Sequence, residues 1–130
     1  MTISQLVEKM SSKYPSIRYS VSDHGLVVSA QTPTGFDVTF HGDSGAYSVS
    51  LAGWHEDFQD DDEAARCFLF GLSKGCRLRV LRRGRMDYKW IVQHQEDGRW
   101  QDESTCGWLF FPFWLPRRER ILQNDYDPAA

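Results

Sequence analysis

The clearest helical pattern in the sequence lies between residues 60 and 75, with strand-like segments on both sides. The acidic run from Asp60 to Glu63 supplies an N-cap and a negatively charged first turn, and both favour the partly positive start of a helix. Lys74 and Gly75 place a cation and a glycine where such a helix should end. The pattern therefore predicts a core helix. The side that should face a sheet carries Ala65, Leu69 and Leu72, with Ala64 and Phe68 beside them.

The chain before this helix alternates between apolar and polar residues, as half-buried strands do. It opens with a short amphipathic helix, which Thr2 and Gln5 are spaced to cap and Pro15 should end. Turn residues then recur at regular intervals, which predicts an antiparallel meander of four strands. We expect these strands at residues 17–22, 26–31, 36–41 and 46–51, followed by a loop at residues 52–59.

After the core helix the alternation returns. The pair Asp97-Gly98 is the strongest hairpin signal, because both residues tolerate the positive φ of a two-residue turn. Residues 108–111 are apolar on both faces, which suits a central strand or an intersubunit contact, and Pro112 should end their pairing. We expect strands at residues 76–81, 86–95 and 99–104, a short helix within residues 117–122 and a frayed tail at residues 124–130.

The predicted fold class is α+β, in one domain covering residues 1–130: a helix, a four-strand meander, the core helix, three to four strands and a short C-terminal helix. The strands should form a single antiparallel sheet of about seven strands, with the helices packed on one face. This order broadly resembles that of small secretion-chaperone domains, which are acidic and dimeric. The chain has one strand more in each half and shares no motif with that family, so no functional residue carries over.

Composition supports a single globular domain, because 130 residues with 41% hydrophobic and 25% charged side chains can bury a core without disulfides or metal. The three cysteines are an odd number without CxxC spacing, which argues against a disulfide framework or a zinc ribbon. We therefore expect them to be reduced. The start of the chain has no signal-peptide pattern, and the longest apolar run is far shorter than the ~20 residues that span a bilayer. We therefore expect a cytoplasmic protein without a membrane partner. The net charge of −3 gives no overall attraction to nucleic acid.

One set of residues has the types of a catalytic base, nucleophile and orienting carboxylate: His94, Cys106 and either Asp102 or Glu103. A two-residue turn at residues 97–98, however, places His94 opposite residue 101, so that Cys106 lies roughly 17 Å away at about 3.4 Å per residue. The histidines also share no short metal-ligand spacing. We therefore expect no enzymatic activity, no metal and no cofactor.

A cluster of cations lies in and around the predicted hairpin that follows the core helix. Together with Tyr88 and Trp90, it could bind phosphates and stack bases. Acidic residues at the start of the core helix and cations near its end also suit the helix macrodipole, which explains the separation of charge without any ligand. The candidate nucleic-acid residues are Arg77, Arg79, Arg82, Arg83 and Arg85.

The most unusual segment is residues 107–116, in which every residue other than Gly and Pro is large and apolar. A domain of this size has limited interior for them, so some should either cap the core or form a contact surface rich in Trp and Phe. The candidate interface residues are Trp108, Phe110, Phe111, Phe113 and Trp114.

These observations lead to three hypotheses of function. The leading one is a non-enzymatic protein-interaction domain that forms a homodimer, or binds another protein, through the aromatic segment. The first alternative is a nucleic-acid-binding domain that uses the basic hairpin between Arg77 and Arg85. The second alternative is a small-molecule pocket between the sheet and the core helix.

Overall fold

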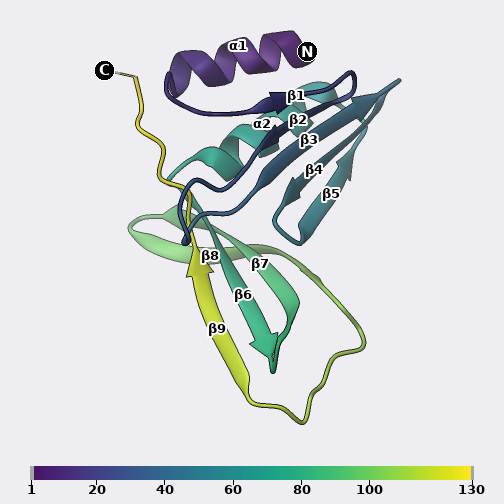
Figure 1. Cartoon of the computed structure of the whole chain (residues 1–130), viewed down its shortest axis with the longest axis vertical. Coiled ribbons are helices and arrows are strands. Elements are labelled where there is room, and N and C mark those ends of the chain that lie inside the picture. The colour runs from purple at the N-terminus through teal and green to yellow at the C-terminus, as the bar shows by residue number, and fades with distance from the viewer. Residues whose placement is uncertain (1, 130) are drawn as a thin grey trace.

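The computed structural model describes residues 2–129. Within this range the chain forms two helices and nine strands, arranged as in Figure 1. None of the helices in this range is long and apolar enough to cross a membrane. The helices are α1 (Ile3–Lys13) and α2 (Asp61–Leu72). The strands are β1 (Ser20–Val21), β2 (Gly25–Val28), β3 (Val38–Asp43), β4 (Ala46–Leu51), β5 (Trp54–Phe58), β6 (Cys76–Arg83), β7 (Met86–Glu96), β8 (Arg99–Gly107) and β9 (Arg117–Leu122).

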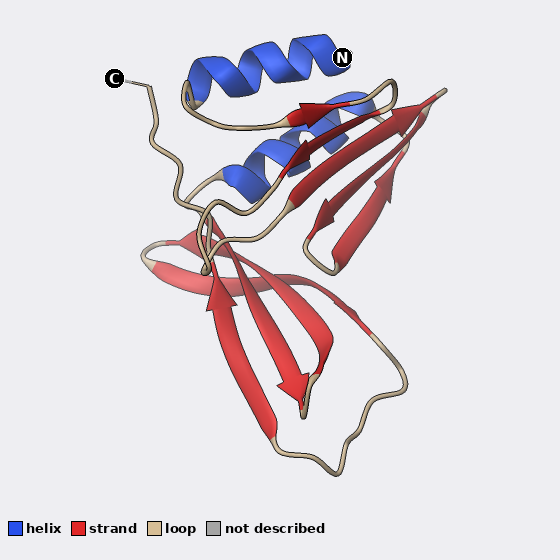
Figure 2. Cartoon of the chain, viewed as in Figure 1, coloured by secondary structure: helices blue, strands red, loops and turns tan. Residues whose placement is uncertain are grey.

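The strands form two antiparallel sheets (Figure 2). The first sheet has the order β1-β2-β3-β4-β5, and the second sheet has the order β8-β7-β6-β9. An α+β fold with antiparallel strands is therefore confirmed, whereas the predicted single sheet is wrong. The physical reason is that β6 pairs with β7 on one side and with β9 on the other, so it offers no free edge to the first sheet.

Both helices pack on the buried face of the first sheet. β3 and β4 pair with Phe40 directly opposite Val49. Both side chains belong to the main hydrophobic core, which α2 covers. α1 contacts the neighbouring strand β2, and its start carries the predicted cap between Thr2 and Gln5. The meander therefore keeps one face dry and one face open to solvent.

β5 occupies residues that were expected to form a loop. Ala52 and Gly53 connect it to β4 in a tight turn, in which Ala52 has a φ of 54°. The strand was missed because three polar residues separate the apolar ends Trp54 and Phe58. Gly53 lies so close to Trp90 of the second sheet that a Cβ atom would come within 2.2 Å of the ring. β5 therefore brings the two sheets together.

The second sheet is built on the predicted hairpin. Asp97 and Gly98 have φ angles of 52° and 76°, and His94 pairs with Gln101 as predicted. Residues 117–122, in contrast, form strand β9 and not the predicted helix. Pairing with β6, which lies about forty positions away in the sequence, stabilises β9 as a strand. Local propensity contains no information about such a distant partner.

Helix α2 begins where the acidic run predicts. The side chain of Asp60 caps it by accepting a hydrogen bond from the backbone N–H of Asp62 at 3.2 Å. The helix ends earlier than predicted, with Ser73 as its C-cap. Its buried side is also rotated, because Phe68 is fully buried whereas Leu69 is half-buried at the margin of the core.

The C-terminal segment, for which the sequence predicts a frayed tail, contacts the rest of the domain through Asn124 and Tyr126. The buried Asn124 accepts a hydrogen bond from the backbone N–H of Phe36 at 3.0 Å and donates one to the carbonyl of Gly71 at 3.0 Å. Tyr126 is buried beside the end of α1. A buried amide with two backbone partners fixes the segment that carries it.

The burial of α2 predicts different effects for two neighbouring truncations. Phe68→Ala should lower the free energy of unfolding by about 3–5 kcal/mol, because it removes a ring from the centre of the core. Leu69→Ala should cost less than about 2 kcal/mol, because that side chain is only half-buried. Urea denaturation followed by circular dichroism measures both. Equal losses would show that the helix is rotated relative to this structure.

Candidate interaction surface

Residues 108–116 connect β8 to β9 and form a loop at the end of the second sheet away from the helices (Figure 1). We call this segment the aromatic loop. Of the two alternatives for residues 108–111, the central strand is not formed, because β6 and β7 occupy the centre of the second sheet. Most of its apolar side chains face solvent, with 90% of Leu109 and 89% of Phe110 exposed, and Trp108, Phe113 and Trp114 are also exposed.

Phe111 attaches the aromatic loop to the second sheet. Its ring stacks on that of Tyr88, with 4.3 Å between the ring centroids and 17° between the planes. Tyr88 itself belongs to a small apolar cluster with Leu81 and Ile91, separate from the main core. Phe111 is half-buried by these contacts. Phe111 therefore supports the loop, whereas the other four candidate interface residues are exposed to solvent.

Arg83 holds the backbone of the same loop. Its Nη1 donates hydrogen bonds to the carbonyl oxygens of Phe113 at 3.1 Å and Leu115 at 3.0 Å. Its guanidinium carbon lies 5.7 Å from the ring centroids of both Tyr88 and Phe111, a favourable cation–π distance. From the sequence alone, Arg83 is a candidate phosphate ligand. The structure instead uses its planar group to fix a loop, a role that depends on contacts too distant in sequence to be read from the pattern.

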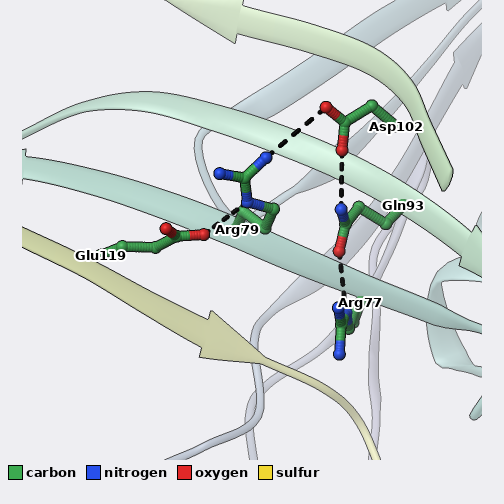
Figure 3. Close-up of polar contacts among 5 residues, drawn as sticks. All are labelled: Arg77, Arg79, Gln93, Asp102 and Glu119. Atoms are coloured by element: carbon green, nitrogen blue, oxygen red, sulfur yellow. Dashed lines mark hydrogen bonds and ion pairs between the residues drawn. The ribbon is translucent and has the colours of Figure 1, made fainter. Parts of the chain in front are cut away.

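Two more of the candidate nucleic-acid residues take part in a polar ladder on the open face of the second sheet (Figure 3). Arg77 donates to Gln93 at 2.8 Å, and Gln93 donates to Asp102 at 2.6 Å. Arg79 reaches Asp102 at 3.5 Å and also forms a close ion pair with Glu119. The hydrogen bond from Arg79 lowers the pKa of Glu119 and raises that of the arginine. These side chains therefore bind one another across four strands.

The remaining cations divide into paired and free groups. Arg82 binds Asp87 at 2.7 Å, and Arg120 binds the second oxygen of the same carboxylate at 2.8 Å. Arg85 and Arg118 are exposed, and neither forms a hydrogen bond or ion pair with another residue in the range 2–129. Of the five candidate nucleic-acid residues, only Arg85 therefore keeps its charge free of an internal partner in the described structure.

Of the residues considered for catalysis, His94 and Glu103 lie together, with 3.4 Å between Nδ1 and the carboxylate oxygen, but Cys106 lies apart from them. His94 is opposite Gln101, whereas Cys106 is opposite Trp90, on the far part of the same hairpin. The thiol of Cys106 donates a hydrogen bond to the backbone carbonyl of His55 at 3.3 Å. His94 therefore has no access to the sulfur atom.

Three carboxylates at the start of α2 lie within 4.8 Å of one another, those of Asp60, Asp61 and Asp62. Asp60 already accepts the capping hydrogen bond of the helix. Acidic first turns are favoured by the helix dipole itself. The cluster is therefore explained by helix formation without a metal ion.

A half-open groove of about 490 Å³ lies between α2, β5 and β8, and we call it the α2 groove. Its floor consists of three buried residues, Leu51, Trp54 and Val92. Phe58 and Phe70, both half-buried, form aromatic walls. The α2 groove is therefore lined largely by apolar side chains that lack a full cover.

The rim of the α2 groove is polar and mainly acidic. Glu56 and Glu103 are exposed on it, with Arg66 as the basic residue of the lining. Burial, together with these two carboxylates, raises the pKa of the Cys67 thiol to about 12. The thiol therefore stays protonated at neutral pH and is a poor nucleophile. The groove offers an apolar surface with an acidic border, and not a reactive centre.

Comparison with known proteins gives no relative for this chain. No protein-family model matches it, and neither characterised proteins nor solved structures give a significant match.

The contacts of Arg83 predict that a conservative change loosens the aromatic loop. Arg83→Lys keeps the charge but loses the planar group that reaches two carbonyls and two rings. The backbone amides of Phe113 and Leu115 donate hydrogen bonds within the loop. Their hydrogen exchange should accelerate by about tenfold or more, because a charged hydrogen bond contributes about 1.5 kcal/mol or more. Arg85→Lys is the matched control and should leave these rates unchanged. Identical exchange in both variants would mean that Arg83 does not hold the loop.

Proposed function

We propose that this chain is a non-enzymatic protein-interaction domain that self-associates through the aromatic loop. The observation that carries the proposal is the exposure of Trp108, Leu109, Phe110, Phe113 and Trp114 on one short segment. Monomeric proteins rarely expose a contiguous apolar patch of this kind, and interfaces are enriched in Trp and Phe. Burial against another protein chain removes this surface from water.

The anchoring of the loop supports the same proposal. Phe111 and Arg83 fix the loop before any partner arrives, so less conformational entropy is lost on binding. Phe113 and Trp114 form an edge-to-face pair with 5.3 Å between ring centroids. Together they make a preformed aromatic projection, which is the kind of feature that becomes an interface hot spot.

Nucleic-acid binding is a second candidate function, and one observation favours it. Arg85 and Arg118 carry exposed, unpaired charges near the aromatic loop, and aromatic rings beside arginines can stack bases. It ranks lower because Arg77, Arg79 and Arg82 are engaged by other side chains of the second sheet.

The proposed self-association predicts a concentration-dependent dimer. Analytical ultracentrifugation should find the parent chain dimeric at tens of micromolar, an ordinary concentration for a weak interface. The variant Phe113→Ser, Trp114→Ser should be monomeric, because hot-spot residues contribute about 2 kcal/mol or more each. Tyr19→Ser, which changes an exposed aromatic residue outside the loop, is the control and should dimerise like the parent. A monomeric parent, or a dimeric double variant, would contradict the proposal.

Fluorescence anisotropy with a labelled single-stranded oligonucleotide tests the second candidate. If the chain is a protein-interaction domain, it should bind the oligonucleotide no more tightly than about 0.1 mM at physiological salt, the weak end of non-specific affinity. Tighter binding that falls steeply with salt, and that is lost in Arg85→Glu, Arg118→Glu, would instead favour the nucleic-acid function.

A further inference from the structure

We infer that the aromatic loop of one copy docks in the α2 groove of a second copy, and that the second copy returns the same contact. This inference rests on the proposed function, because it takes the aromatic loop as the surface of self-association. The inference adds the α2 groove as the site that binds the loop of the other copy. The structure carries both halves of a complementary pair: an exposed aromatic projection at one end and a partly covered apolar groove beside α2.

The loop cannot fill the groove of its own chain. Arg83 and Phe111 tie it to the second sheet. Figure 1 shows the loop at the end of that sheet away from the helices. The α2 groove lies against α2 and β5. The projection must therefore find its site on another molecule.

The size and lining of the groove suit the projection. A volume of about 490 Å³ lies within the range of about 300–1,000 Å³ in which proteins bind medium-sized apolar groups. The walls, Phe58 and Phe70, present half-buried aromatic surface to an entering ring. Edge-to-face and offset contacts with Phe113 and Trp114 would be favourable there. Both surfaces would lose their contact with water in one step.

The charges of the two ends are complementary. Glu56 and Glu103 stand on the rim of the groove, and Arg117 and Arg118 follow the loop directly. The same separation holds for the whole chain: residues 1–73 carry ten acidic and four basic side chains, whereas residues 76–122 carry ten basic and six acidic ones. This distribution favours an arrangement in which the basic end of one copy faces the acidic end of the other.

A reciprocal arrangement closes after two copies. Each copy gives one loop and one groove, so the dimer has a two-fold axis and two identical contacts. Direct contact between two loops would instead bring Arg117 and Arg118 of both copies together. The repulsion between these like charges would oppose a dimer of that kind. The reciprocal dimer therefore uses both features and avoids the clash of like charge.

The test combines a loop variant with a groove variant. The loop variant is Phe113→Ser, Trp114→Ser, and the groove variant is Glu56→Lys, Glu103→Lys. Asp57→Lys is the matched control, because Asp57 neighbours Glu56 on β5 but lies on the opposite face of the strand. Circular dichroism first confirms that each variant is folded, and sedimentation equilibrium then measures the dimer dissociation constant.

Both double variants should dimerise at least a hundredfold more weakly than the parent, whereas Asp57→Lys should be unaffected. An equimolar mixture of the loop and groove variants should recover a heterodimer, because the mixture still contains one intact loop and one intact groove. That heterodimer should be weaker than the parent dimer, since it has one contact in place of two. A mixture that stays monomeric would overturn the inference.

The outcomes separate this inference from the proposed function. If the groove variant dimerises like the parent while the loop variant does not, the groove is not the receiving site, and self-association through the loop still stands. If the loop variant dimerises like the parent, both proposals fail.

A second measurement does not depend on the groove variant. Cys67 lines the groove, so its alkylation, located by mass spectrometry, should be slower in the parent than in the loop variant at the same concentration. Equal alkylation rates in a dimeric parent and a monomeric loop variant would overturn the inference.

Discussion

Helix α2 packs against strands of both sheets, and the way the two sheets meet depends on this contact. It touches β3, β4 and β5 of the first sheet and β6 of the second. The approach to the first sheet is so close that a Cβ atom on Gly71 would come within 2.4 Å of Leu51, so a larger residue would push the helix away. Phe68 fills the space beneath the helix and meets Phe40 edge to face. With α2 in this position, β5 meets β8, and Trp54 donates a hydrogen bond to Ser104 at 3.0 Å.

A consequence of this arrangement is that the second sheet is supported at one end and projects at the other. The projecting end has no helix over it and must be stabilised by its own side chains. The polar ladder through Arg79 and the cluster around Tyr88 both do this, because cross-strand pairs stabilise a sheet that is wet on one face. Charged residues along β9 also discourage pairing at its open edge. Most arginines of this sheet therefore stabilise the sheet itself. The exposed aromatic loop is attached to this stabilised end.

The features that the sequence predicts correctly are those decided by neighbouring residues. The cap at Asp60 and the turn at Asp97-Gly98 each depend on the conformation of two to four adjacent residues. The failures involve partners far away in the chain. β9 forms by pairing with the edge of β6 opposite β7, and Asn124 is held by the backbone groups of Phe36 and Gly71. The aromatic loop could be recognised from its composition alone, but its anchor on Arg83 could not, because arginine is equally suited to a phosphate, a carbonyl or a ring.

The separation of charge along the chain has a different origin from the one that the sequence suggested. The helix macrodipole accounts for the acidic first turn of α2, but the last turn of this helix contains no basic residue. Lys74, the cation expected there, forms an ion pair with Asp125 of the C-terminal segment at 2.9 Å. The basic character of the second sheet arises instead from arginines that bind within the sheet or lie on its edge. Arg79, Arg82 and Arg120 form their ion pairs with carboxylates of the second sheet itself. The two ends therefore present opposite charge to solvent, which is the condition under which two copies would attract each other end to end.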